Sequence, residues 1–374
     1  MFAQVLLLLP VVLSAVLTTA FPTSERSLLA SVATTEKASL AARAAAQPLT
    51  LANSNWIWTG EEDSAGGSAP IGSRPFRKTI PHTSTKCPVC ATVLIATDNL
   101  HTLYVNGAEV GSGASFSSAQ VYTVGLNPES DNVITVNGTN TGGPAAVIAT
   151  ILVDYADGTT ETFVSDASWK TLKAAPPAGF ANPSLDDSAW IAAVGQGKEG
   201  VSPWGQTALP PALDMTQSNW IWTGETDSTG SAPVGHRAFR KTVTSPYGKG
   251  AVCAKVVITV DNAYTLYANG QSLGSGTDFN TAQAYSVPQL DPDQNIFAVD
   301  GENTGGPAGV IATILVAYND GTSASYVTDT TWKASTSLPT GFQLPATDDS
   351  TWSDATIVGK YGSAPWGAIT VPAA

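Results

Sequence analysis

The sequence predicts an all-β protein made of two antiparallel β-sandwiches in tandem. The chain of 374 residues is rich in Gly and Trp and poor in Lys, Glu and Met, which favours strands and turns over helices. Short apolar or alternating runs are broken at regular spacing by Gly, Asn and Asp, as in sandwiches. The pattern also recurs after about 160 residues, a period far too long for a solenoid unit.

The N-terminal segment lacks this β pattern. Residues 1–20 hold an apolar run followed by small residues, which predicts a secretory signal peptide. The run is short for a membrane span, although no Lys or Arg precedes it. Residues 21–50 are rich in Ala, Ser and Thr and are interpreted as a propeptide or flexible stem. We therefore expect a secreted, extracellular protein.

Two repeat units follow, predicted at residues 51–209 and 212–374. Only a short joint containing Pro210 and Pro211 separates them, so a stiff tandem is expected. The segments that match between the units are 54–61 with 218–225, 76–78 with 239–241, and 140–144 with 303–307.

Strands can be placed in order within each unit. A buried run is followed by an alternating run that ends in Asn-Gly, the pair that suits a tight hairpin. The expected strands are 91–97, 102–105, 132–136, 147–155 and 160–164 in the first unit, and 255–260, 265–268, 295–299, 310–318 and 323–327 in the second. No stretch after residue 50 shows a sustained helical period.

The three cysteines leave their pairing open. Cys87 and Cys90 have the spacing of a redox or zinc pair, but neither a βαβ pattern nor a second ligand pair accompanies them. An oxidising compartment permits one disulfide and leaves one cysteine over. Cys90 and Cys253 occupy matching positions in the two units, which also suits small buried residues where a strand begins.

The net charge of −13 bears on possible partners. It argues against nucleic acid and anionic membrane surfaces, and it leaves carboxylates for a cation such as calcium. The three histidines show no pattern for nucleophilic catalysis. The adjacent carboxylates of Asp186-Asp187 and Asp348-Asp349 lie on single turns, unlike two groups that flank a scissile bond. A protein that is not an enzyme is therefore expected.

The motifs taken together resemble the N-terminal jelly-roll domain of α-L-rhamnosidases and the rhamnose-binding modules of carbohydrate-binding module family 67. They are Trp-x-Trp, Phe-Arg-Lys, Asp-Asn-x-x-x-Leu-Tyr-x-Asn-Gly, Asn-Thr-Gly-Gly-Pro, Asp-x-x-Trp-Lys and Pro-Trp-Gly. The resemblance covers both units almost end to end and implies a galactose-binding-like jelly roll in each. Because signal, stem and units use all the residues, we expect no catalytic domain like that of the rhamnosidases.

The resemblance also implies a calcium ion in the loops at one end of each sandwich, with sugar hydroxyls completing its coordination. Calcium accepts about six to eight oxygens from carboxylates, amides and carbonyls together. The implied ligands are Asp98, Asn99, Asn140 and a carbonyl near Pro144 in the first unit, and Asp261, Asn262, Asn303 and a carbonyl near Pro307 in the second. The alternative is that each Asp-Asn pair simply caps a strand and forms a side-chain turn.

Three further features concern a sugar site. The units differ at His101, which is Tyr264 in the second unit; if these side chains border the sugar, the two affinities should differ. The ten Trp suit stacking on sugar rings, but the spacing of Trp56 and Trp58 on a strand puts both rings on one face and favours packing. The sequon 137–139 predicts glycosylation of Asn137.

These observations predict a secreted, non-catalytic, lectin-like protein that binds L-rhamnose or a similar sugar of polysaccharides or glycans with the help of calcium. Two sites on a stiff tandem would add avidity. Two alternatives stay open. One is a glycosidase of the rhamnosidase type, or its accessory module, and the other is a structural or adhesive protein of the cell wall.

Overall fold

The computed structural model describes residues 49–62, 68–228 and 231–374. The predicted signal peptide and nearly all of the predicted stem lie outside these residues. The regular structure of the described part consists of strands, β1 to β24. Within that part, no helix has the length and apolar character needed to cross a membrane.

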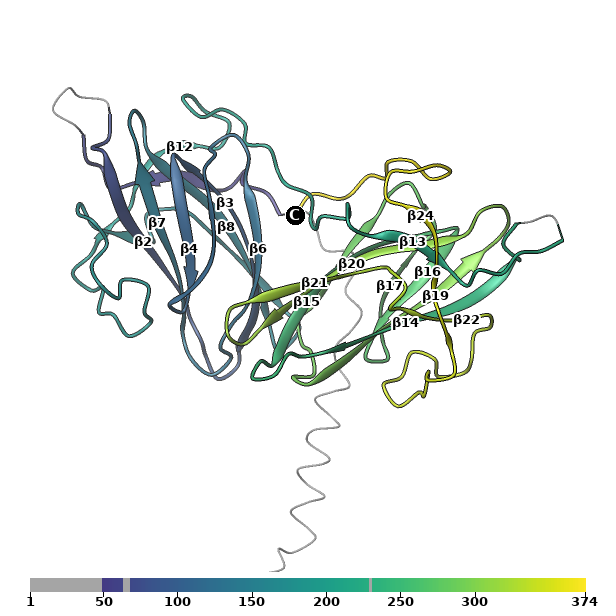
Figure 1. Ribbon diagram of the computed structural model, residues 1–374. Helices are drawn as coiled ribbons and strands as arrows, with labels where there is room; N and C mark the ends of the chain where they lie inside the picture. The colour runs from purple at the N-terminus through teal and green to yellow at the C-terminus, as the bar shows by residue number, and fades with distance from the viewer. Residues whose placement is uncertain (1–48, 63–67, 229–230) are drawn as a thin grey trace, which may run out of the picture. The chain divides into compact units, whose positions relative to one another are not determined.

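The first sandwich contains two antiparallel sheets (Figure 1). One has the order β12-β1-β8-β3-β6, with β9 beside β8, and the other has the order β11-β10-β2-β7-β4-β5. The strands are β1 (Asn55–Trp58), β2 (Gly72–Ile80), β3 (Pro88–Asp98), β4 (Leu100–Val105), β5 (Ala108–Gly113), β6 (Gln120–Gly125), β7 (Asn132–Asn140), β8 (Ala146–Tyr155), β9 (Thr160–Val164), β10 (Lys170–Thr171), β11 (Ile191–Ala192) and β12 (Val194–Lys198).

The second sandwich repeats this strand order. Its sheets run β18-β15-β20-β13-β24, with β21 beside β20, and β17-β16-β19-β14-β22-β23. The strands are β13 (Asn219–Trp222), β14 (Gly235–Thr244), β15 (Ala251–Asp261), β16 (Ala263–Ala268), β17 (Gln271–Gly276), β18 (Gln283–Val287), β19 (Gln294–Asn303), β20 (Gly309–Tyr318), β21 (Ser323–Val327), β22 (Lys333–Ser335), β23 (Ser353–Asp354) and β24 (Thr356–Lys360). The predicted all-β fold of two antiparallel sandwiches is confirmed.

Each sandwich has an apolar core between its own two sheets. In the first core Trp58 packs against Phe76, and in the second Trp222 packs against Phe239. The expectation that Trp56 and Trp58 share one face is wrong. The register of β1 against β12 shifts between Trp56 and Ile57. Trp58 therefore packs in the core between the sheets, whereas Trp56 is buried in a second apolar cluster that contains Trp204.

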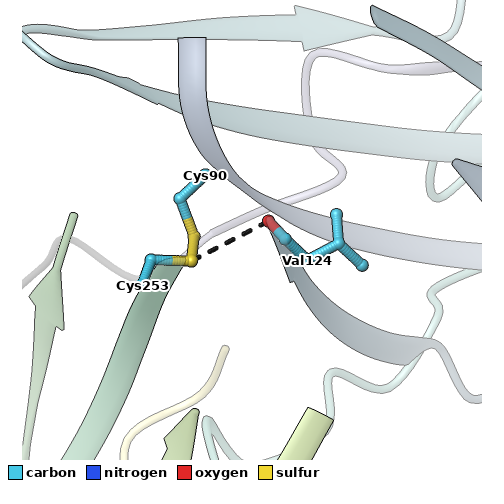
Figure 2. Close-up of a disulfide and its surroundings, with 3 residues drawn as sticks. All are labelled: Cys90, Val124 and Cys253. Carbon is cyan, nitrogen blue, oxygen red and sulfur yellow. Dashed lines mark hydrogen bonds between the residues drawn. A yellow bond between two sulfur atoms is a disulfide. The ribbon is translucent and has the colours of Figure 1, made fainter. Parts of the chain in front are cut away.

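A disulfide joins the two sandwiches (Figure 2). It links Cys90 near the start of β3 to Cys253 near the start of β15, with a Cα–Cα distance of 6.2 Å. Cys87 remains a free, half-exposed thiol, so the Cys-x-x-Cys spacing does not mark a redox or zinc pair. Val89 and Ala317 surround the bond with apolar side chains.

A charged pair accompanies the disulfide. Lys255 belongs to β15, the strand that contacts β3 and β6 of the first sandwich, and its side chain is buried. Burial lowers the pKa of Lys255 to about 8, and the charge of Asp154 on β8 acts in the opposite direction. The disulfide connects the two sandwiches covalently, and the charge of Asp154 in the first sandwich favours the protonated form of Lys255 in the second.

A buried arginine holds the long loop before β23 in place. The guanidinium of Arg240 in β14 donates from Nε to Asp349 Oδ2 at 2.7 Å and to the carbonyl oxygens of Leu344 and Thr347 at 3.1 and 3.2 Å. It also donates to the carbonyl oxygen of Phe342. Replacing Arg240 by methionine should lower the free energy of unfolding by about 3–5 kcal/mol, because the half-buried carboxylate of Asp349 and the buried carbonyl oxygen of Phe342 would lose their donor. Urea unfolding followed by tryptophan fluorescence measures the change.

The control for Arg240→Met is Lys333→Met. Lys333 pairs with Asp354 at 2.7 Å, but 36% of the Lys333 side chain and 66% of the Asp354 side chain are exposed to solvent. Removing an exposed pair should change the free energy of unfolding by less than about 1 kcal/mol. Equal losses in the two variants would show that the Arg240 contacts do not stabilise the loop.

Candidate functional site

Two segments meet at one end of each sandwich. The first is the Asp98-Asn99 turn between β3 and β4, and the second is the loop that follows β7. The backbone N–H of Thr141 donates to Asn99 Oδ1 at 2.7 Å. The second sandwich repeats the contact at 2.7 Å, from Thr304 N–H to Asn262 Oδ1. The structure thus brings together the Asp-Asn pairs and the Asn-Thr-Gly-Gly-Pro loops.

The carboxylate of Asp98 is buried and held by two donors. Asn99 Nδ2 donates to its Oδ1 at 2.7 Å, and Trp204 Nε1 donates to its Oδ2 at 2.9 Å. Burial raises the pKa of this carboxyl, and the Trp204 hydrogen bond acts in the opposite direction. Within the described residues, Asp98 has no ion pair with a Lys, Arg or His. A buried carboxylate without a positive partner is costly, so a bound cation would be stabilising here.

Asp261 has the same surroundings in the second sandwich. Asn262 Nδ2 donates to its Oδ1 at 2.8 Å and Trp366 Nε1 to its Oδ2 at 2.9 Å. Burial raises the pKa of Asp261 as well. The hydrogen-bonding pattern of the candidate site is therefore present twice.

Two tryptophans that the sequence analysis did not assign to the site support these carboxylates. Trp204 stacks on Trp56 with ring centroids 4.9 Å apart, and Trp366 stacks on Trp220 at 4.5 Å. Each stack fixes the indole that donates to the buried Asp. The signal in the sequence was the Pro-Trp-Gly motif near the end of both units.

The side chain of Asn140 shapes the loop from within. It is fully buried, its Nδ2 donates to the carbonyl oxygens of Ala69 and Pro70 at 2.8 and 3.3 Å, and its Oδ1 accepts from Gly142 N–H at 2.9 Å. Asn303 makes the equivalent bonds to Ala232, Pro233 and Gly305. A metal ligand at either position would be the backbone carbonyl or the remaining lone pair of Oδ1.

The glycines after Asn140 keep the loop open. Gly142 and Gly143 have φ values of 147° and 78°, which side chains rarely adopt, yet a Cβ at either would touch nothing within 4 Å. Gly305 and Gly306 repeat these features. Pro144 and Pro307 are exposed beside them. No neighbouring side chain therefore covers the outer face of these glycines.

The donor atoms fit calcium better than a transition metal. In the part of the chain that the structure describes, no group of three or more His, Cys, Asp or Glu side chains could hold a metal ion. Each candidate site instead combines one carboxylate with carboxamide and backbone oxygens, all hard donors. The absence of a charged partner for Asp98 in the described residues agrees with this fit.

His101 and Tyr264 lie in the interior. Only 2% of His101 and 4% of Tyr264 is exposed, which contradicts the expectation that they border a sugar. His101 Nδ1 shares a hydrogen bond with Thr97 Oγ1 at 2.9 Å, and burial lowers its pKa to about 4. The hydroxyl of Tyr264 shares one with Tyr285 at 2.9 Å. On alternating strands, these positions face the core.

Asn137 lies within a strand rather than on a turn. It belongs to β7, which pairs with β2 on one side and β4 on the other. The side chain is half-buried, and its Oδ1 is buried without a hydrogen-bond partner in the described structure. Glycosylation of Asn137 stays a prediction.

Comparison with known proteins places the chain among lectins. No family model matches it. The crystal structure of the lectin from Pleurotus ostreatus in complex with GalNAc is 50% identical, with a TM-score of 0.82, and the match covers 89% of this chain and 99% of that chain. The chain belongs to the family of this fungal lectin. The apo form of the lectin matches with a TM-score of 0.83, 50% identity, and coverage of 89% of this chain and 98% of the lectin.

A second similarity extends outside this lectin family. The α-L-rhamnosidase of Streptomyces avermitilis is 35% identical over 168 residues, which is 42% of this chain and 16% of the rhamnosidase. The chain therefore matches only a small part of that enzyme. The predicted resemblance to the rhamnosidases is confirmed at this level, whereas the lectin match extends over both sandwiches.

Proposed function

We propose that the chain is a secreted, non-catalytic lectin with two calcium-dependent carbohydrate sites, one at the end of each sandwich. The observation that carries the proposal is one arrangement that recurs in both sandwiches: a buried Asp is hydrogen-bonded to the next residue, an Asn, which accepts a hydrogen bond from the Thr at the start of an open Gly-Gly-Pro loop. The family relationship supports carbohydrate as the ligand. GalNAc and L-rhamnose are the sugars to test first, because the relatives and the resemblance to family 67 point to them.

The chain's own residues would provide the metal site. Asp98 and Asn99, with a carbonyl near Pro144, would hold calcium in the first sandwich, and the matching residues of the second would do the same. Calcium bound there would supply open coordination positions that two neighbouring hydroxyls of a sugar can occupy. Trp204 would keep the carboxylate of Asp98 in one orientation before the ion and the sugar arrive.

Titration calorimetry tests the proposal with GalNAc and L-rhamnose as ligands. The protein should bind at least one of them in calcium chloride, lose the binding in excess EDTA, and regain it when calcium is restored. Magnesium should not restore it, since that ion demands a tighter octahedral geometry. Unchanged affinity in EDTA would exclude the role of calcium, and a glycan array without any bound sugar would exclude a lectin.

The partial similarity to a rhamnosidase supports one competing function, that of a glycoside hydrolase or its accessory module. Incubation with an aryl rhamnoside separates the two. A lectin releases no phenol from the substrate, whereas a hydrolase releases the phenol in proportion to time and protein concentration.

A further inference from the structure

Two aliphatic side chains stand out on the surface. Among the described residues, Ile71 and Val234 are the most exposed of the large aliphatic residues, with 74% and 68% of their surface open to solvent. They occupy matching positions, since Ile71 directly precedes Gly72 of β2 and Val234 directly precedes Gly235 of β14. One exposed apolar residue is ordinary, but the same exposure in both sandwiches calls for a common explanation.

Ile71 lies beside the candidate site. Its neighbour Pro70 accepts a hydrogen bond from Asn140 Nδ2, and its other neighbour Gly72 pairs with Asn140 in the sheet. Ala69 N–H donates to the carbonyl oxygen of Gly143 at 3.3 Å. The segment that carries Ile71 is thus bonded to the open loop.

Val234 has the same relation to the second site. Pro233 accepts a hydrogen bond from Asn303 Nδ2 at 3.2 Å, and Gly235 pairs with Asn303. The backbone segments that carry Ile71 and Val234 are therefore held next to the residues proposed to bind calcium and sugar.

We propose that Ile71 and Val234 are specificity-determining residues that contact a methyl group of the bound sugar. The inference rests on the proposed function and adds the chemical feature that each site selects. A sugar held by its hydroxyls is polar, so an apolar neighbour contributes only where the ligand presents an apolar group. The acetamido group of GalNAc and carbon 6 of L-rhamnose each end in such a methyl.

The first site offers the larger apolar surface. Leu100, which is 40% exposed, pairs with Thr139 of β7, one residue before Asn140. Its strand β4 and the strand β2 that follows Ile71 flank β7 on opposite sides. In the second sandwich, the smaller Ala263 replaces Leu100 and Val234 replaces Ile71. The first site should therefore discriminate more strongly for the methyl group.

Calorimetry on the double variant Ile71→Ser/Val234→Ser tests the inference. The ligands form two matched pairs, GalNAc with galactose and L-rhamnose with L-mannose, in which the second sugar lacks the methyl group. Losing the burial of about one methyl should weaken binding of the methyl-bearing sugar roughly fourfold and leave its partner unchanged. In each pair, the affinity for the methyl-bearing sugar is divided by the affinity for its partner. The pair in which this ratio falls identifies whether the methyl belongs to an acetamido or a 6-deoxy group.

Two controls make the outcome specific. Ile71→Leu/Val234→Leu keeps an apolar side chain at both positions and should retain the wild-type ratios. Tyr247→Ser removes a fully exposed aromatic residue in the turn between β14 and β15 and should also leave them unchanged. Unchanged ratios in the serine variant would overturn the inference while the lectin function stands. A wild-type protein that binds none of the four sugars would overturn both.

Discussion

Replacing Cys90 and Cys253 together by alanine should lower the free energy of unfolding by about 3–5 kcal/mol. The two cysteines are 163 residues apart, so their bond closes a very long loop in the unfolded chain. The chain-entropy model assigns a large stabilisation to such a loop, because the cross-link removes many unfolded conformations. Guanidinium unfolding under non-reducing conditions, compared with wild type, measures the loss.

The variant should still fold, because each sandwich keeps its own core. Cys87→Ala is the matched control, and it should unfold at the wild-type midpoint because Cys87 takes no part in the bond. Thiol titration of unfolded, non-reduced protein should find a single free cysteine. A double variant as stable as wild type would show that the bond does not constrain the unfolded chain.

The disulfide illustrates what the sequence could and could not predict. Cys90 and Cys253 were seen to match in position, but matching positions alone do not bring two side chains together. Whether two related sandwiches face each other through equivalent strands depends on tertiary contacts, here β15 against β3 and β6. A pairing across such an interface leaves no local signal in either repeat.

Strands were predictable where the side chains alternate or form a buried run. β3, β4, β7 and β8 lie where they are expected, with longer bounds, and β9 has the expected bounds. β2 was not predicted, because its sequence contains two Arg, a Lys and a Pro. Its Arg77 is buried where Asp187, 110 residues away, supplies a carboxylate at 2.9 Å and the loop before Asp187 supplies carbonyl oxygens. A charge that is neutralised from so far along the chain looks exposed in the sequence.

The candidate site was likewise predictable only in part from the sequence. The meeting of Asp98-Asn99 with the loop after Asn140 followed from the resemblance, and the hydrogen bond from Thr141 agrees with it. The inward orientation of His101 did not follow, since alternation separates two faces of a strand without saying which one is buried. The register shift at Trp56 was also hidden, because it arises from pairing with β12.

The single variants Asp98→Asn and Asp261→Asn should each halve the number of sugars bound per chain and sharply weaken binding to a multivalent glycan surface. Each removes the negative charge from one site and leaves the other site intact. Asp98 and Asp261 end the strands whose starts carry the disulfide, about 27 Å from the bond along each strand. Because the disulfide cross-links the tandem, both sites belong to one molecule, so the second binding event is intramolecular.

Titration calorimetry with the free sugar gives the stoichiometry, and surface plasmon resonance on a dense glycan layer gives the avidity. Each single variant should lose about 10²-fold in apparent affinity for the glycan layer, whereas its stoichiometry for the free sugar should fall only by half. The double variant should bind neither the free sugar nor the glycan layer.

Asp348→Asn is the control. It removes an exposed carboxylate from a turn far along the chain from both Asp-Asn pairs, and it should change neither the stoichiometry nor the avidity. Single variants that bind the layer as tightly as wild type would show that the two sites do not act together. A double variant that still binds free sugar would show that the sugar does not bind at the Asp-Asn pairs.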